Sequence, residues 1–135
     1  MRSTHDQITT ARRVALATRL RELSQPLVKM VKCVLISEEE DHYTEIETHL
    51  GSDLYTILKG TATFVGQWPE LEVVIMKCDK SPFDLMENRN ILPEPFENEV
   101  ILGPILLVRM DQHAEPQDFT LNEFLGSLTL RRPRN

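Results

Sequence analysis

Asn88, Arg89 and Asn90 stand together in the stretch ENRNILPEPF, residues 87–96, between two apolar runs. Their amide and guanidinium groups donate hydrogen bonds of the kind that bind carboxylates, phosphates and backbone carbonyls. If they converge, with Gln67 as a further polar contact, they predict a site for a small anionic ligand or a nucleotide. The alternative is a scaffold, in which the asparagines satisfy backbone groups of a turn and the following prolines and apolar residues connect two core strands.

Trp68 and two N-terminal arginines are the candidates for contacts with another protein. Trp68 is the only tryptophan of the chain and stands before Pro69 at an expected hairpin tip. Tryptophan and arginine are enriched at the energetic centres of interfaces, so an exposed Trp68 would indicate a partner site. A buried Trp68 would instead anchor the turn. Arg12 and Arg13 belong to a basic segment that could contact an acidic surface, on a partner or on a second copy.

Histidines stand in two stretches that could support acid–base or metal chemistry. His113 lies between two aspartates, but no nucleophile stands beside it, so a turn histidine is favoured over a catalytic one. His42, Glu45 and His49 would share one face of a helix, but their segment has the pattern of a strand or turn. A zinc site needs three or four converging ligands. We therefore predict neither a catalytic residue nor a metal site.

The motifs of common enzyme classes do not occur in the sequence. It contains no GxGxxG or GxxxxGK phosphate loop, no CxxC, no HExxH and no GxSxG. These absences favour a non-enzymatic protein, and we expect no cofactor. The two cysteines, Cys33 and Cys78, lie in apolar runs. This placement predicts buried, reduced thiols and an intracellular, cytoplasmic location.

The charge of the chain is divided unevenly around its net value of −6. Residues 1–23 hold five arginines against two acids, residues 131–135 hold three arginines, and residues 24–130 hold nineteen acidic against seven basic residues. An acidic body repels phosphate backbones, so nucleic-acid binding is not expected. No apolar run is long enough to span a membrane. The arginines of residues 1–26 leave organelle targeting open beside the favoured amphipathic helix.

Hydrophobic periodicity and turn residues predict the order of the elements. Alanines and leucines without Gly or Pro indicate a helix over residues 3–25, which Pro26 ends. Ser52 is the expected N-cap of a two-turn helix, and Gly60 its expected left-handed end. The remaining apolar and β-branched runs predict strands. These strands cover residues 27–36, 43–50, 61–68 with a bulge at Gly66, 71–78, and 99–110, the last divided by Gly103-Pro104 into 100–102 and 105–110.

The clearest local signal lies near the C-terminus, in the stretch DFTLNEF. Thr120 and Glu123 have the spacing of a capping box, in which each side chain accepts a hydrogen bond from the other residue's backbone. Phe119 and Phe124 stand at the positions of a hydrophobic staple. The sequence therefore predicts a helix over residues 121–128.

This order of elements predicts an α+β fold, because the strands do not alternate strictly with helices. We expect a small mixed or mainly antiparallel sheet of four or five strands with an N-terminal helix and two short helices. The predicted organisation is an amphipathic helix over residues 1–26, a single α+β domain over 27–130 and a basic tail over 131–135.

The segment from Asp53 to Phe124 carries a resemblance. The stretches LYTILKGTATFVGQWPELEVVIMK, NRNILPEPF and GPILLVRMDQHAEPQDFTLNEF resemble an uncharacterised domain family of algae and the large DNA viruses that infect them. More distantly, they are similar to a small phage family of unknown function, which has two glycines where this chain has Gly60. The resemblance implies a domain and carries no assigned activity.

Three functions remain from the sequence. The favoured one is a non-enzymatic protein-interaction or regulatory module, with partner binding or self-association through the N-terminal helix. The alternative is a domain for a small anionic ligand or a nucleotide. An enzyme centred on His113 ranks last. A deep pocket around Arg89 would favour the ligand, and an exposed apolar patch would favour the interaction module.

Overall fold

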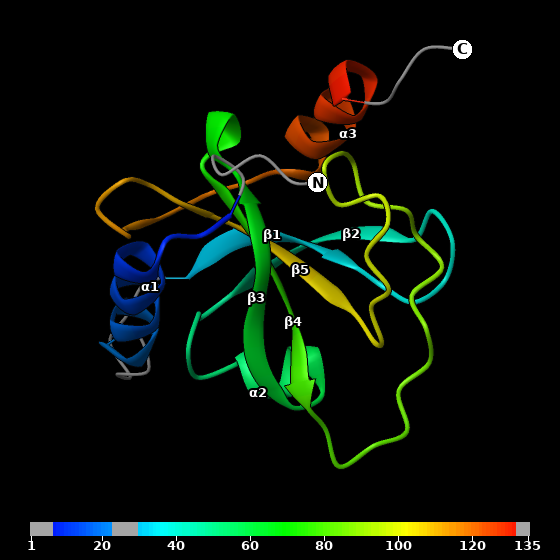
Figure 1. Cartoon of the computed structure of the whole chain (residues 1–135), viewed down its shortest axis with the longest axis horizontal. Coiled ribbons are helices and arrows are strands. Elements are labelled where there is room, and N and C mark those ends of the chain that lie inside the picture. The colour runs from blue at the N-terminus through cyan, green and yellow to red at the C-terminus, as the bar shows by residue number, and fades with distance from the viewer. Residues whose placement is uncertain (1–6, 23–29, 132–135) are drawn as a thin grey trace.

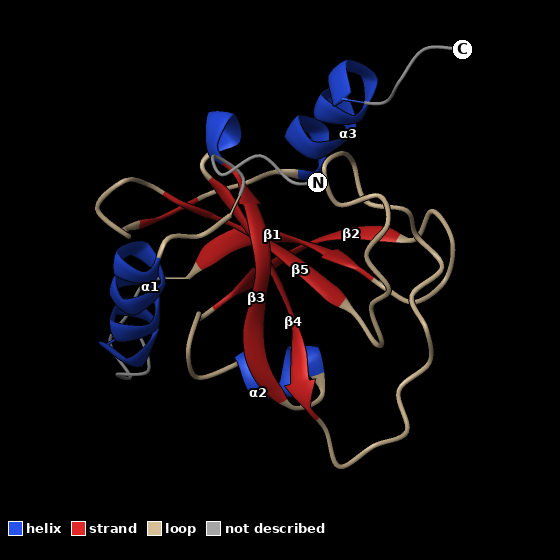
Figure 2. Cartoon of the chain, in the orientation of Figure 1, coloured by secondary structure: helices blue, strands red, loops and turns tan. Residues whose placement is uncertain are grey.

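The computed structural model describes residues 7–22 and 30–131. It contains an antiparallel sheet with the strand order β2-β1-β5-β4-β3, and β6 pairs with β5 outside this path. The predicted α+β class is confirmed, with one short strand more than expected (Figure 2). In chain order the elements are α1 (Thr10–Glu22), β1 (Val31–Ile36), β2 (Tyr43–Thr48), α2 (Leu54–Leu58), β3 (Thr61–Trp68), η1 (Pro69–Leu71), β4 (Val73–Lys80), β5 (Ile105–Met110), β6 (Pro116–Gln117) and α3 (Leu121–Arg131).

The central strands β1, β4 and β5 are buried on both faces, which explains their nearly continuous apolar sequences. Because side chains alternate along a strand, each of these strands contributes to two cores. One core includes side chains of α1 and α2, and the other includes α3 and the loop between β4 and β5. That loop runs as a long yellow-green trace along the right-hand side of the sheet, with α3 above it (Figure 1).

The N-terminal helix is shorter than predicted. Residues 7–9 are not helical, and α1 begins at Thr10. The physical reason is a cap: the Thr9 hydroxyl accepts a hydrogen bond from the Arg12 backbone N–H at 3.2 Å. The predicted start at residue 3 and the predicted end at residues 23–25 lie outside the described residues.

The short helix α2 is bounded differently from the expectation. Asp53, not Ser52, holds the N-cap position, and its carboxylate points back to accept hydrogen bonds from the Thr48 hydroxyl and the His49 N–H. These hydrogen bonds, the one from Thr48 foremost, lower the pKa of Asp53. The predicted Ser52 cap is therefore wrong, because Asp53 instead ties the end of β2 to the start of α2.

Gly60 is required for close packing and not for a left-handed turn. The left-handed residue is Lys59, with φ of 64°. A Cβ at Gly60 would collide with the Lys80 carbonyl oxygen and would lie 2.5 Å from Cys78 Sγ. The predicted left-handed Gly60 is thus wrong, and the glycine allows β3 to start against the end of β4.

The stretch before β5 is not the strand that its apolar residues suggested. Residues 100–102 contribute only an isolated bridge between Glu87 and Leu102, and β5 begins after Pro104. The predicted strand start beside Pro104 agrees with the structure, and so does the bulge near Gly66, where the register shifts between Phe64 and Gly66.

The predicted cap of the last helix is confirmed. The Glu123 N–H donates to the Thr120 hydroxyl, and the Thr120 N–H donates to Glu123 Oε1, both at 3.2 Å. The rings of Phe119 and Phe124 meet edge to face with centroids 6.4 Å apart. Helix α3 continues to Arg131, so it is three residues longer than predicted.

Both cysteines are free and buried. Burial, with a smaller contribution from the charge of Asp118, raises the pKa of the Cys33 thiol to about 12. Cys33 is therefore a protonated core side chain at neutral pH. The cytoplasmic location predicted from the cysteines stays a prediction. None of the helices within residues 7–22 and 30–131 is long and apolar enough to cross a membrane.

Candidate binding pocket

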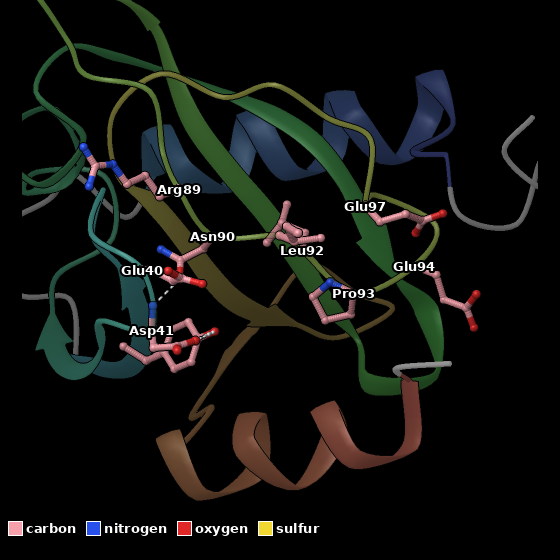
Figure 3. A pocket seen from close by; sticks show the side chains of 10 residues that line it. Glu40, Asp41, Arg89, Asn90, Leu92, Pro93, Glu94 and Glu97 are labelled. Carbon is pink, nitrogen blue, oxygen red and sulfur yellow. Dashed lines mark hydrogen bonds between the residues drawn. The ribbon is translucent and has the colours of Figure 1, made fainter. Parts of the chain in front are cut away.

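The loop that follows Asn88 forms one wall of a pocket of about 510 Å³. The opposite wall is the turn that leads into β2 (Figure 3). Leu92 and Pro93 are buried and supply apolar surface, whereas Ile91 is exposed beside them. The pocket is lined by Glu40, Asp41, Tyr43, Arg89, Asn90, Ile91, Leu92, Pro93, Glu94 and Glu97.

Asn88 does not face this pocket as a ligand contact. Its side chain is buried, and its amide nitrogen lies 3.3, 3.1 and 3.0 Å from the carbonyl oxygens of Ile36, Ser37 and Gly103. Its amide oxygen accepts the Asn90 N–H. Both amide hydrogens are thus used within the chain. This arrangement corresponds to the scaffold alternative, and the ligand contact at Asn88 stays a prediction.

Asn90 lines the pocket, but its amide holds the opposite wall. Its nitrogen donates to the carbonyl oxygens of Ser37 and Glu39, and its oxygen accepts the Asp41 N–H at 2.7 Å. Asp41 has a φ of 59°, so this hydrogen bond supports a backbone conformation that is unfavourable without local support. Asn88 and Asn90 together fasten the turn of residues 37–42 to the loop.

Arg89 is the one member of the predicted donor group whose side chain remains available. Its backbone N–H donates to the Glu38 carbonyl oxygen at 2.9 Å. Its guanidinium is exposed and makes no hydrogen bond or ion pair with a described residue. Figure 3 shows it at one end of the pocket, opposite Glu94 and Glu97.

The other predicted site residues lie elsewhere. Gln67 accepts a hydrogen bond from Arg12 Nε at 3.0 Å, and Arg12 also donates to the carbonyl oxygens of Met110 and Asp111. Arg12 therefore docks α1 onto its own chain and is not free for a partner. Gln67 accepts its hydrogen bond from Arg12 and does not line the pocket. Arg13 is exposed, 5.4 Å from the Phe64 ring centroid.

Trp68 is fully buried, so the structure corresponds to an anchor and not to an exposed contact residue. Its indole N–H donates to the Glu94 carbonyl oxygen at 3.1 Å, and its ring meets Phe96 edge to face. Through these contacts the hairpin tip fixes the wall of the pocket that carries Glu94 and Glu97.

His42 and His113 lie in polar loops, and Glu45 lies on β2. The Asp111 carboxylate accepts the backbone N–H groups of Glu115 and His113. The hydrogen bond from Glu115 is the largest cause of the lowered pKa of Asp111. His42 lies 3.5 Å from the Glu39 carboxylate. Within the part of the chain that the structure describes, no three His, Cys, Asp or Glu side chains are grouped as metal ligands.

The electrostatics of the pocket are acidic. Its lining contains one guanidinium, that of Arg89, and four carboxylates, those of Glu40, Asp41, Glu94 and Glu97. The sequence did not predict this set of carboxylates. Glu40 and Asp41 lie in the charged run EEED, which is typical of a solvated turn, and Glu94 and Glu97 stand on either side of Pro95 and Phe96. Their convergence depends on the asparagine contacts between segments about fifty residues apart, so the acidic surplus of the body was the only signal.

The fold and the pocket define a small α+β domain with an antiparallel sheet and an acidic cavity beside its longest loop. Residues 34–126 match DUF5880, a family of unknown function, and because this match covers more than half of the chain, the chain belongs to that family. Neither a curated protein nor a solved structure matches it. The resemblance to algal, viral and phage proteins stays a prediction.

Proposed function

We propose that this protein is a non-enzymatic interaction module that binds a positively charged segment of a partner protein in the acidic pocket. The observation that supports this function is the lining: buried Leu92 and Pro93 lie beside Glu94 and Glu97, and Glu40 and Asp41 stand on the opposite wall. Lysine and arginine side chains combine an apolar stem with a charged end. A cavity with apolar surface and carboxylates on two sides fits that chemistry.

The anionic-ligand alternative is weakened by the same lining. A phosphate or carboxylate in the pocket would meet four negative groups and gain one guanidinium. Like charges at such distances cost free energy even in a high effective dielectric. Asn88 and Asn90, which would have supplied further donors, are used within the chain.

A catalytic role has less support than binding. The described residues that line the pocket include no Ser, Thr, Cys, Lys or His. These residue types supply most of the nucleophiles in covalent catalysis. Self-association through the N-terminal helix stays a prediction.

The test is a selection of random dodecapeptides on the full chain, followed by affinity measurements. We expect the selected peptides to be rich in Lys and Arg and to bind less tightly as the salt concentration rises. The double variant Glu94→Gln and Glu97→Gln should weaken their binding about tenfold, since each exposed ion pair contributes up to about 1 kcal/mol.

The matched control is the double variant Glu47→Gln and Glu72→Gln, which removes the same charge from exposed positions outside the pocket. It should change the affinity less than twofold. The proposed function is wrong if the selected peptides are neutral or acidic. It is also wrong if both double variants weaken binding equally, because the effect would then be one of net charge alone.

A further inference from the structure

A second depression lies on the other side of the turn of residues 37–42. It is a groove of about 560 Å³ between α2 and the segment that follows β4. In contrast to the acidic pocket, its walls are mostly large apolar side chains. The groove is lined by Glu38, Tyr55, Thr56, Lys59, Phe83, Asp84, Leu85 and Met86.

These apolar side chains are unusually exposed. The exposed fractions are 52% for Tyr55, 63% for Phe83 and 61% for Met86. Across the segment of residues 83–85, a neighbouring depression is lined by Val100 and Leu102, which are also exposed. Five of the nine exposed large hydrophobic residues in the described part of the chain therefore gather around one segment. Exposed apolar surface concentrated in this way marks interaction sites.

The groove is held open by specific contacts. The Ser81 hydroxyl donates to the Lys59 carbonyl oxygen and accepts the Phe83 N–H at 3.0 Å. At the other end, the Gly103 N–H donates to the Met86 carbonyl oxygen at 2.7 Å. The segment is thus fastened at both ends while Phe83 and Met86 stay in solvent, which is the arrangement of a formed binding surface.

The groove adjoins the acidic pocket. Glu38 lines the groove, and Glu40 and Asp41 of the same turn line the pocket. In the segment of residues 86–89, Met86 lines the groove and Arg89 lines the pocket. This segment is joined to the turn by the Arg89 N–H, which donates to the Glu38 carbonyl oxygen. One ridge, formed by residues 37–41 and 87–89, therefore separates the two depressions.

The charges at the groove suit the same partner. Glu38 forms an ion pair with Lys59 at 3.3 Å, which leaves the carboxylate of Asp84 as the surplus charge of the lining. A basic segment is attracted along the whole surface from Asp84 to Glu97, and an acidic one is repelled. A neutral apolar surface of a second copy would not use this surplus.

We propose that the groove binds an aromatic or long aliphatic side chain of the same basic segment whose Lys or Arg side chain enters the acidic pocket. This inference rests on the proposed function. It adds a second requirement for the bound segment, which is an apolar residue near the basic residue. Tyr, Phe and Met side chains on the protein suit such an anchor because they bury large apolar areas and adapt in shape.

The experiment uses the full chain and the selected peptides. Sequences should contain an apolar residue at a fixed separation from a Lys or Arg. The double variant Phe83→Ser and Met86→Ser should lower affinity about tenfold, and Val14→Ser, at a residue that is 60% exposed on α1, should change it less than twofold. Replacing the peptide's apolar residue by Ala should lower affinity by the same factor, without further loss in the double variant.

A spectroscopic measurement on the unmutated chain removes any dependence on the folding of the variants. With ¹³C-labelled methionine methyl groups, the Met86 signal should shift on peptide addition, whereas the buried Met76 and Met110 signals should stay in place. The inference is overturned, and the proposed function stands, if basic peptides require Glu94 and Glu97 but leave the Met86 signal unchanged.

Two further outcomes are decisive. Selection of peptides without basic residues overturns the proposed function and this inference with it. If light scattering shows a dimer without peptide that Phe83→Ser converts to a monomer, a second copy occupies the groove, and the inference is overturned.

Discussion

The two faces of the sheet are covered in different ways. On the face of α3 and the long loop, the covering side chains are large, aromatic and fully buried: Trp68, Phe96, Phe119 and Phe124. They contact one another edge to face, and Trp68 also donates a hydrogen bond into the loop. This cover belongs to the same packed unit as the sheet.

On the opposite face, α1 contributes a single fully buried side chain, Leu16. Leu20 packs against the same core but is only partly buried. The polar attachments are the hydrogen bonds from Arg12 to the end of β5 and an ion pair between Arg19 and Glu115. Exposed ion pairs contribute little. The comparison indicates that the first face unfolds only with the whole protein, whereas α1 detaches locally at lower cost.

The largest effect is expected from removing the indole that joins the hairpin tip to the loop. Trp68→Ala should lower the free energy of unfolding by about 3–5 kcal/mol, because it leaves a large cavity and removes the hydrogen bond from the indole to the Glu94 carbonyl group. Urea unfolding measures this change, and Trp68→Phe should lose less. A loss below about 1 kcal/mol for Trp68→Ala would show that the two faces do not differ as described.

The next effect separates neighbours in the loop. Asn88→Ala should cost about 2–3 kcal/mol, because the buried hydrogen bonds to the Ile36 and Gly103 carbonyl groups are lost, whereas Ser37 keeps its donor Asn90. Arg89→Ala should cost less than about 0.5 kcal/mol, because its guanidinium is exposed. Thermal unfolding of both variants measures these changes. Equal losses of stability in Asn88→Ala and Arg89→Ala would contradict the assignment of Asn88 to the scaffold and of Arg89 to the exposed lining of the pocket.

The opposite face should respond locally. Leu16→Ala should abolish hydrogen-exchange protection of the α1 amides while lowering global stability by less than about 1 kcal/mol, since detachment of α1 limits the loss. Val14→Ala, at an exposed position on the same helix, is the matched control. Simultaneous loss of protection in α1 and β5 would show that α1 belongs to the global unit instead.

The smallest effect is a pH dependence at the start of α3. Partial burial opposes the charged form of Glu123, but the hydrogen bond from Arg109 and the cap at Thr120 outweigh it, so the pKa of Glu123 is lowered. Its stabilisation is therefore complete above the ordinary glutamate pKa of about 4.3 and is lost as the pH falls through the folded pKa. The melting temperatures of wild type and Glu123→Gln should differ at pH 6 and converge towards pH 3. A constant difference would assign the effect to packing.

The parts of the fold that depend on local signals could be predicted from the sequence. Thr120 and Glu123 hydrogen-bond to each other within one turn, and the rings of Phe119 and Phe124 meet beside them, as their spacing predicted. The sheet followed from apolar runs. Gly60 packs against Lys80 and Asn88 donates to Gly103, so the role of each residue depends on a distant segment and not on local sequence.

The candidate pocket was predictable only in its location. The sequence indicated that the loop after Glu87 had either a binding or a scaffold role, and the structure divides these roles between two adjacent residues. Asn88 points inward to β1 and Gly103, and Arg89 points to solvent. Which side chain points inward depends on backbone direction in an irregular loop, which has no periodicity to read.

The position of β5 between β1 and β4 has a consequence for biosynthesis. In the described sheet, β1 pairs with β2 and β3 pairs with β4, and only β5 joins these two hairpins. A nascent chain that has not yet reached Ile105 therefore exposes two apolar strand edges without their shared partner. Because β5 follows both hairpins in the chain, their facing edges stay open to pairing with other strands until Ile105–Met110 has been synthesised.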